Sequence, residues 1–135
     1  MWGRIDGLRT LDLGTPGDMR TQLNDLVLSG AKTGTASLLE HDYRAENEEL
    51  EHVGERLVLV DDNDGRLAEV EVTAVEVVPF KAVTWKFAES EGEGFRSVEH
   101  WGEAHRRFWA NAGYEVDDTT EIVCVNFRLV GSGPF

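Results

Sequence analysis

Apolar residues recur at helical spacing in three parts of the chain, and two of these parts begin at residues that favour a helix start. Thr15 is a candidate N-cap for the first helix, and Gly30 suits the residue that follows its end. Ser97 is a candidate N-cap for the last. The predicted helices are Pro16–Ser29, with Met19, Leu23, Leu26 and Val27 on the apolar side, Phe80–Glu89, with Val83 and Phe87, and Ser97–Ala112, with Val98, Trp101, Phe108, Trp109 and Ala112.

Between and after these helices the pattern is typical of strands. Arg56–Asp61 is apolar on both faces, which predicts a central strand, and the turn residues Asp62–Gly65 predict a hairpin. Leu67–Val78 then alternates, but its phase slips near Val75, which predicts a β-bulge there. Glu121–Val130 is a late strand with alternate apolar residues. The inward positions of the second strand are Ala68, Val70, Val72 and Ala74, and those of the late strand are Val123, Val125, Phe127 and Leu129.

The order of these elements predicts an α+β fold in one domain. The chain has 135 residues, close to the commonest domain size, and it shows no internal repeat or linker. Strands separated unevenly by helices favour a small, mostly antiparallel sheet or barrel with helices outside it. Residues 1–12 are expected to wrap the surface or to add a short strand, and residues 131–135 to form a C-terminal tail.

The composition limits the partners of the protein. Thirteen Lys and Arg against twenty-six Asp and Glu leave a net charge of −13, which disfavours duplex DNA and restricts any contact with phosphates to a small basic spot. No apolar run approaches the ~20 residues that cross a bilayer, so we expect no membrane contact. The single cysteine, Cys124, leaves no intrachain disulfide, and a cytoplasmic location is the natural expectation.

Familiar cofactor motifs are absent from the sequence. The stretch Gly30–Thr33 lacks the glycine that a phosphate-binding loop carries directly before its lysine. His100 and His105 are five residues apart on a predicted helix, so their side chains diverge instead of chelating a metal. We therefore expect no cofactor, although a divalent metal held by carboxylates stays open.

Two segments could carry chemistry. Lys32 and Thr35 follow the first helix, where a turn would bring them together, and a hydroxyl beside a lysine can act as a nucleophile if burial leaves the lysine neutral. The alternative is ordinary surface chemistry. The stretch Glu89–Gly94 alternates glutamates with small residues, either as a solvated loop or as an acid that orients a lysine or protonates a leaving group. His105 interrupts an apolar helix face, as a core-edge histidine or as part of a cleft.

Together these segments resemble a known family. The stretch Leu26–Leu39, then Val75–Phe80, Phe87–Gly94, Ser97–Trp101 and His105–Phe108, occurs in the order found in bacterial ASCH domains, which are related to PUA-like RNA-binding barrels. The resemblance spans residues 13–130 and implies a PUA-like β-barrel with flanking helices and a cleft beside the Lys-Thr-x-Thr segment. The catalytic residues carried over by motif are Lys32, Thr35 and Glu91, and the residues expected to bind substrate are Ser37, Glu93, Ser97, Trp101 and His105.

The resemblance implies three functions. The first is hydrolysis of an N4-acylated cytidine. In this reaction Thr35 is the nucleophile, Lys32 activates it, and Glu91 transfers the proton of the departing amine. This reaction needs an oxyanion site, for which backbone N–H groups around Gly34 are candidates. The second is a metal-dependent ribonuclease acting on single-stranded RNA, and the third is a non-catalytic RNA-binding regulator. The expected partner is a pyrimidine nucleoside or a short single-stranded RNA.

Overall fold

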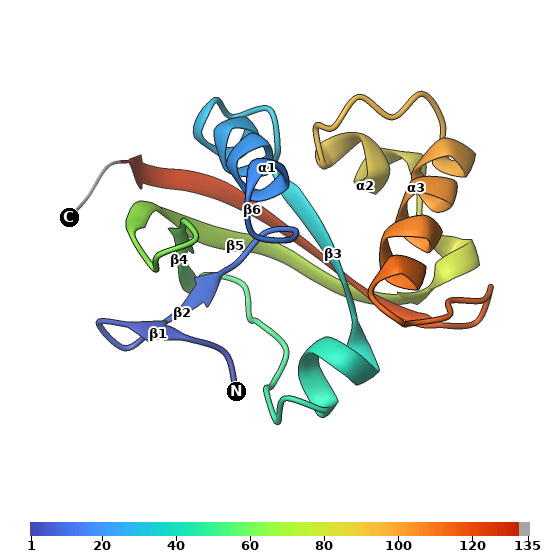
Figure 1. Ribbon diagram of the computed structural model, residues 1–135, viewed down its shortest axis with the longest axis horizontal. Coiled ribbons are helices and arrows are strands. Elements are labelled where there is room, and N and C mark those ends of the chain that lie inside the picture. The colour runs from blue at the N-terminus through green and yellow to red at the C-terminus, as the bar shows by residue number, and fades with distance from the viewer. Residues whose placement is uncertain (133–135) are drawn as a thin grey trace.

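Six strands form one mixed sheet in the computed structural model, which describes residues 1–132 (Figure 1). The strands lie in the order β1-β2-β4-β5-β6-β3, and all neighbours pair antiparallel except β2 and β4. The predicted α+β fold is confirmed, but the sheet does not close on itself, so the word barrel applies only loosely. The strands are β1 (Arg4–Ile5), β2 (Leu8–Leu11), β3 (Gly34–Leu38), β4 (Arg56–Val60), β5 (Arg66–Pro79) and β6 (Glu121–Ser132).

Three α-helices and two shorter helices join these strands. Figure 1 shows β1 and α3 toward opposite ends of the long axis of the molecule. Ser97 caps α3 as predicted, since its hydroxyl accepts a hydrogen bond from the N–H of His100 at 3.0 Å. The helices are α1 (Asp18–Leu28), the π-helix η1 (Leu39–Arg44), the 3₁₀-helix η2 (Phe80–Ala82), α2 (Trp85–Ser90) and α3 (Val98–Asn111).

Strand β6 separates two hydrophobic clusters. Alternate residues of a strand point to opposite faces, so Val123, Val125 and Phe127 belong to one cluster and Ile122 and Cys124 to the other. The first cluster includes the apolar side of α1, Leu57 and Leu59 of β4, and the buried residues of β5. The second includes residues of α2 and α3. Helices thus cover both faces of β6, and α2 also packs against its neighbour β3.

The bulge predicted in β5 is present, but two residues earlier than expected. The register with β6 shifts between Val72 and Ala74, which leaves Thr73 as the extra residue. Before the bulge Val72 faces the first cluster, and after it Val75 does, which explains the slip of phase in the sequence. The prediction that Ala74 points inward is therefore wrong, since this residue is exposed.

Three helix predictions need correction. Gly17, not Thr15, occupies the N-cap position of α1, and its N–H donates to Asp62 of the β4–β5 turn at 2.8 Å. The helix predicted over Phe80–Glu89 divides into η2 and α2, because the hydroxyl of Thr84 caps a new helix by accepting from the N–H of Phe87. Ala112, expected on the apolar side of α3, is exposed at its C-cap.

The ends of the chain add strands to the sheet. Both β1 and β2 lie within residues 1–12, where a short strand was one expectation. At the other end, β6 continues through Gly131 and Ser132, which pair with β5. Residues 133–135 of the expected tail lie outside the described part of the chain. None of the helices within residues 1–132 is both long and apolar enough to cross a bilayer.

Candidate functional site

Two segments far apart in the sequence dock against each other beside β3. The N–H of Thr33 donates to the carbonyl of Ser90 at 2.7 Å. Gly92 has a φ of +67°, and a Cβ at this residue would lie 2.1 Å from the carbonyl oxygen of Ala31. Only glycine allows this approach. The contact brings Lys32 next to Glu91, although 59 residues separate them.

Lys32 lies between two carboxylates. Its Nζ donates to Oε1 of Glu91 at 3.2 Å and to Oε2 of Glu93 at 3.0 Å. The side chains of Lys32 and Glu91 are each 2% exposed, whereas that of Glu93 is 22% exposed. Buried charges occur in proteins when they are paired in this way. The structure therefore brings together Lys32, Glu91 and Glu93, all named from the sequence, in one ion cluster.

The second oxygen of Glu91 meets donors from α3. Trp101 donates its indole N–H to Oε2, and Nε2 of His105 lies 3.2 Å from the same oxygen. Burial alone raises the pKa of Glu91, but the hydrogen bond of His105, the charge of Lys32 and the bond of Trp101 outweigh it, so this pKa lies below its ordinary value. Glu91 is thus held in its ionised form.

His105 has an oxygen at each ring nitrogen. Its Nδ1 lies 2.9 Å from the carbonyl of Trp101, which can only accept, and its Nε2 faces the ionised Glu91. The ring also stacks on Trp101, with 4.1 Å between the centroids. Lys32 and His105 therefore both contact the carboxylate of Glu91, and Lys32 also contacts that of Glu93.

A cavity of about 180 Å³ lies next to this cluster. Lys32, Glu91, Glu93 and His105 form its polar side, and Thr35 also lines it. The rest of the wall is largely apolar. The apolar side chains are Leu13, Met19, Leu23, Phe95, Ala104, Phe108 and Trp109.

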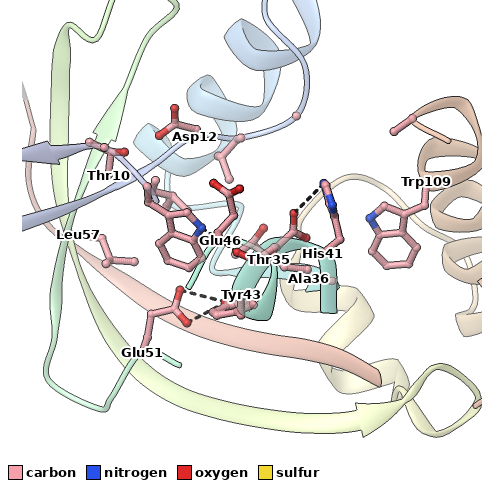
Figure 2. A pocket seen from close by; sticks show the side chains of 18 of the residues that line it. Thr10, Asp12, Thr35, Ala36, His41, Tyr43, Glu46, Glu51, Leu57 and Trp109 are labelled. Carbon is pink, nitrogen blue, oxygen red and sulfur yellow. Dashed lines mark hydrogen bonds and ion pairs between the residues drawn. The ribbon is translucent and has the colours of Figure 1, made fainter. Parts of the chain in front are cut away.

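Thr35 stands where this cavity meets a larger one of about 610 Å³, because it lines both (Figure 2). Ala36 and Trp109 likewise line both cavities. Thr35 lies in β3, in register with Val125 of β6, and is half-buried. Within residues 1–132 its hydroxyl makes no hydrogen bond to another group. It is therefore free to contact a ligand in either cavity.

The larger cavity is acidic and aromatic. One wall comes from the π-helix η1, which supplies His41, Asp42 and Tyr43. The Tyr43 hydroxyl donates to Oε1 of Glu51 at 2.8 Å, as Figure 2 shows. Burial raises the pKa of Glu51 and that of Asp42. Sequence reasoning missed this wall, since residues 39–55 carry no motif or regular period that distinguishes them from a surface loop.

The remaining predicted residues take different places. Ser37 lines the larger cavity, two residues after Thr35 on the same strand. Ser97 lines neither of these cavities and serves as the cap of α3. Trp101 is 1% exposed, and its role is to donate a hydrogen bond to Glu91. Among residues 1–132, no group of three or more histidines, cysteines, aspartates and glutamates is arranged to hold a metal ion.

Comparisons with known proteins agree with this arrangement. The sequence model of the ASCH domain matches residues 11–131. Protein EF3133 from Enterococcus faecalis V583 is 31% identical with a TM-score of 0.77, over 89% of this chain and 74% of that one. An ASCH domain from Lactobacillus crispatus JV V101 is 28% identical with a TM-score of 0.76, over 90% of this chain and 79% of that one. No curated protein matches the sequence.

Proposed function

The chain belongs to the ASCH domain family, and from this premise we propose that it hydrolyses the acyl group of an N4-acylated cytidine, with Thr35 as the nucleophile. One observation carries the proposal: the unpaired hydroxyl of Thr35 stands at the junction of two cavities, next to a buried lysine–glutamate cluster. A hydroxyl nucleophile needs a neighbouring group that takes its proton, and this cluster supplies one.

The two cavities suit the two parts of such a substrate. The smaller one, about 180 Å³ with apolar side chains opposite its polar side, matches a short acyl group. The larger one, about 610 Å³, is within the usual range for a small-molecule site and has room for the base and its ribose. The scissile amide bond would then lie at Thr35, where the cavities meet.

The ion cluster constrains the path of the proton. Lys32 accepts the proton of Thr35 only after passing one of its own to a carboxylate. Glu91 is held ionised by Trp101 and His105, whereas Glu93 contacts only Lys32 among the described residues and is more exposed. Glu93 is therefore better placed than Glu91 to receive this proton and to deliver it to the departing amine. Glu91 then serves to hold Lys32 in place.

The proposed reaction has two steps, transfer of the acyl group to Thr35 and hydrolysis of the resulting ester. In the first, the Thr35 oxygen bonds to the acyl carbon, the C–N4 bond breaks, and the amine leaves with the proton that Glu93 received from Lys32, while Lys32 keeps the proton that Thr35 gave up. In the second, a water molecule hydrolyses the acyl ester of Thr35, and the threonine regains its proton. The products are cytidine and a carboxylic acid.

The charge distribution favours a nucleoside over a polymer. Four cations are candidates to face a phosphate. Lys32 is enclosed by glutamates, Arg44 pairs with Glu40, and Arg106 donates to Asp118, which leaves Arg107 as the candidate without an ion-pair partner among residues 1–132. A polymer held by many phosphate contacts would need clustered, available cations. The larger cavity instead carries the carboxylates of Asp12, Asp42, Glu46 and Glu51.

The test is to incubate the protein with N4-acetylcytidine and with single-stranded RNA, each with and without EDTA, and to identify the products by mass spectrometry. We expect cytidine and acetate, unaffected by EDTA. Thr35→Ala should stay folded by circular dichroism and lose turnover, and the loss should match that of the triple variant lacking Thr35, Lys32 and Glu91.

Two results contradict the proposal. Full activity in Thr35→Ala rejects the nucleophile. A wild-type protein that leaves N4-acetylcytidine intact but cleaves RNA only with Mg²⁺ or Mn²⁺ supports the ribonuclease instead.

A further inference from the structure

Strand β3 is an edge of the sheet, and its open side borders the candidate site. It pairs with β6 alone, and no other strand within residues 1–132 lies beyond it. Ala36, in the middle of β3, lines both cavities together with Thr35. Backbone groups on this open side are therefore available to a ligand at the junction of the cavities.

The ladder with β6 decides which backbone groups face the open side. Phe127 donates its N–H to the carbonyl of Thr33 at 3.0 Å, and the same register pairs Thr35 with Val125 and Ala36 with Cys124. In an antiparallel pair, hydrogen-bonded and non-hydrogen-bonded positions alternate. Thr35 is consequently a bonded position, and the N–H and C=O of Ala36 point away from β6.

A second contact supports this orientation independently. Leu38, two residues further along β3, donates its N–H to the carboxylate of Asp42 at 2.8 Å, outside the ladder. Residues two apart on a strand direct their backbone groups to the same side. No residue among 1–132 accepts from the N–H of Ala36.

We propose that the backbone N–H of Ala36 is the oxyanion donor of the site. This inference rests on the proposed function and specifies which atom stabilises the tetrahedral intermediate. When the Thr35 oxygen bonds to the acyl carbon, the carbonyl π electrons move to the acyl oxygen, and the N–H of Ala36 donates a hydrogen bond to that oxygen. When the C–N4 bond breaks, the carbonyl re-forms and the hydrogen bond weakens.

The position along the chain suits this role. The N–H that follows a nucleophile is a recurrent oxyanion donor in hydrolases, because it lies within reach of the carbonyl under attack. Ala36 directly follows Thr35, and pairing of the flanking residues with β6 holds it in place. A donor fixed before the reaction needs no reorganisation when charge develops, and removing such a donor costs roughly 10²- to 10³-fold in kcat.

The experiment removes this N–H and leaves the side chains of the site unchanged. Ala36→Pro deletes the donor at an edge position whose N–H takes no part in the ladder, where proline is tolerated. Replacement of residue 36 by the α-hydroxy analogue of alanine changes the amide into an ester and provides a second variant if the proline does not fold. Ala36→Gly keeps the N–H and removes only the methyl group, so it separates the effect of the donor from that of the side chain.

With N4-acetylcytidine as substrate, we expect kcat to fall about 10²- to 10³-fold in the folded proline or ester variant, with KM changed much less. The loss of kcat in Ala36→Gly should be much smaller than in these two variants. Unchanged kcat in either variant, with folding checked by circular dichroism, overturns the assignment. That result leaves the proposed function intact, whereas absence of turnover in the wild-type protein overturns both.

Discussion

Replacing Gly92 by alanine tests the contact that assembles the candidate site. The added Cβ would lie 2.1 Å from the carbonyl oxygen of Ala31, and ordinary contact begins near 3.4 Å, so the segments must separate by about 3.4 − 2.1 = 1.3 Å. Gly94 is the matched control, because it too has a positive φ, +82°, but has nothing within 4 Å of its Cβ.

Gly92→Ala should therefore lose more stability than Gly94→Ala. A left-handed φ costs an alanine about 1–2 kcal/mol, and this cost applies at both positions. The clash at Gly92 adds about 1–3 kcal/mol, as is usual for overpacking. Because Glu91 and Glu93 move away from Lys32 with the segment, we also expect about a 10²-fold loss of turnover in folded Gly92→Ala, since a misplacement of ~1 Å has that effect.

Urea denaturation followed by circular dichroism measures the free energy of unfolding, and release of cytidine from N4-acetylcytidine measures turnover per folded molecule. Gly94→Ala should lose stability but keep its turnover. Equal losses of stability in the two variants, or equal turnover, would refute the argument that the contact between Ala31 and Gly92 positions the cluster.

Three other predictions concern buried charges and the thiol. Lys32→Ala should lower the free energy of unfolding by about 3–5 kcal/mol, measured in urea, because it leaves the carboxylate of Glu91 buried without its cation; a loss below 1 kcal/mol would contradict the buried cluster. The pKa of Glu91 is lowered, so its contribution to stability is present above its ordinary value of 4.5 and is lost below it. Burial raises the pKa of Glu51, so its contribution is full below 4.5 and is lost as the pH rises. Melting temperatures measured between about pH 3 and 8 should therefore fall less in acid for Glu91→Gln than for wild type. Glu51→Gln should be more stable than wild type at pH 7 only. Melting temperatures that change with pH in parallel for variants and wild type would argue against both pKa shifts. Burial raises the pKa of Cys124 to about 12, so a thiol reagent at pH 8 should label the unfolded protein and not the folded one, and rapid labelling of the native protein would be the contrary result.

The local elements were largely predictable from the sequence. The alternation of β5 and β6, the hairpin at Asp62–Gly65 and the Ser97 cap depend on residues a few positions apart, so the sequence contains their cause. The split of the helix predicted over Phe80–Glu89 has a local cause, the Thr84 cap. The error at the start of α1 lies where a distant contact intervenes. Gly17 begins α1 because its N–H binds Asp62 of another turn, which no local pattern indicates.

The candidate site was predictable in part. The resemblance named Lys32, Thr35 and Glu91 by motif, and all three line one cavity. Spacing alone did not decide whether these three residues are functional, because a lysine near a threonine and a glutamate in a glycine-rich loop are also common on surfaces. The larger cavity was not predictable, since Tyr43 and Glu51 acquire their environment only through burial.

The sequence by itself determined the element types, the acidic charge and the residue types available for chemistry, because periodicity, caps and composition act over short range. Only the tertiary structure decided that Gly92 meets Ala31, that His105 faces Glu91, and that the backbone of Ala36 lies on an open edge. Each of these depends on which distant segments pack together. Strand order and ion pairing across such distances minimise the energy of the whole fold, so no single segment contains them.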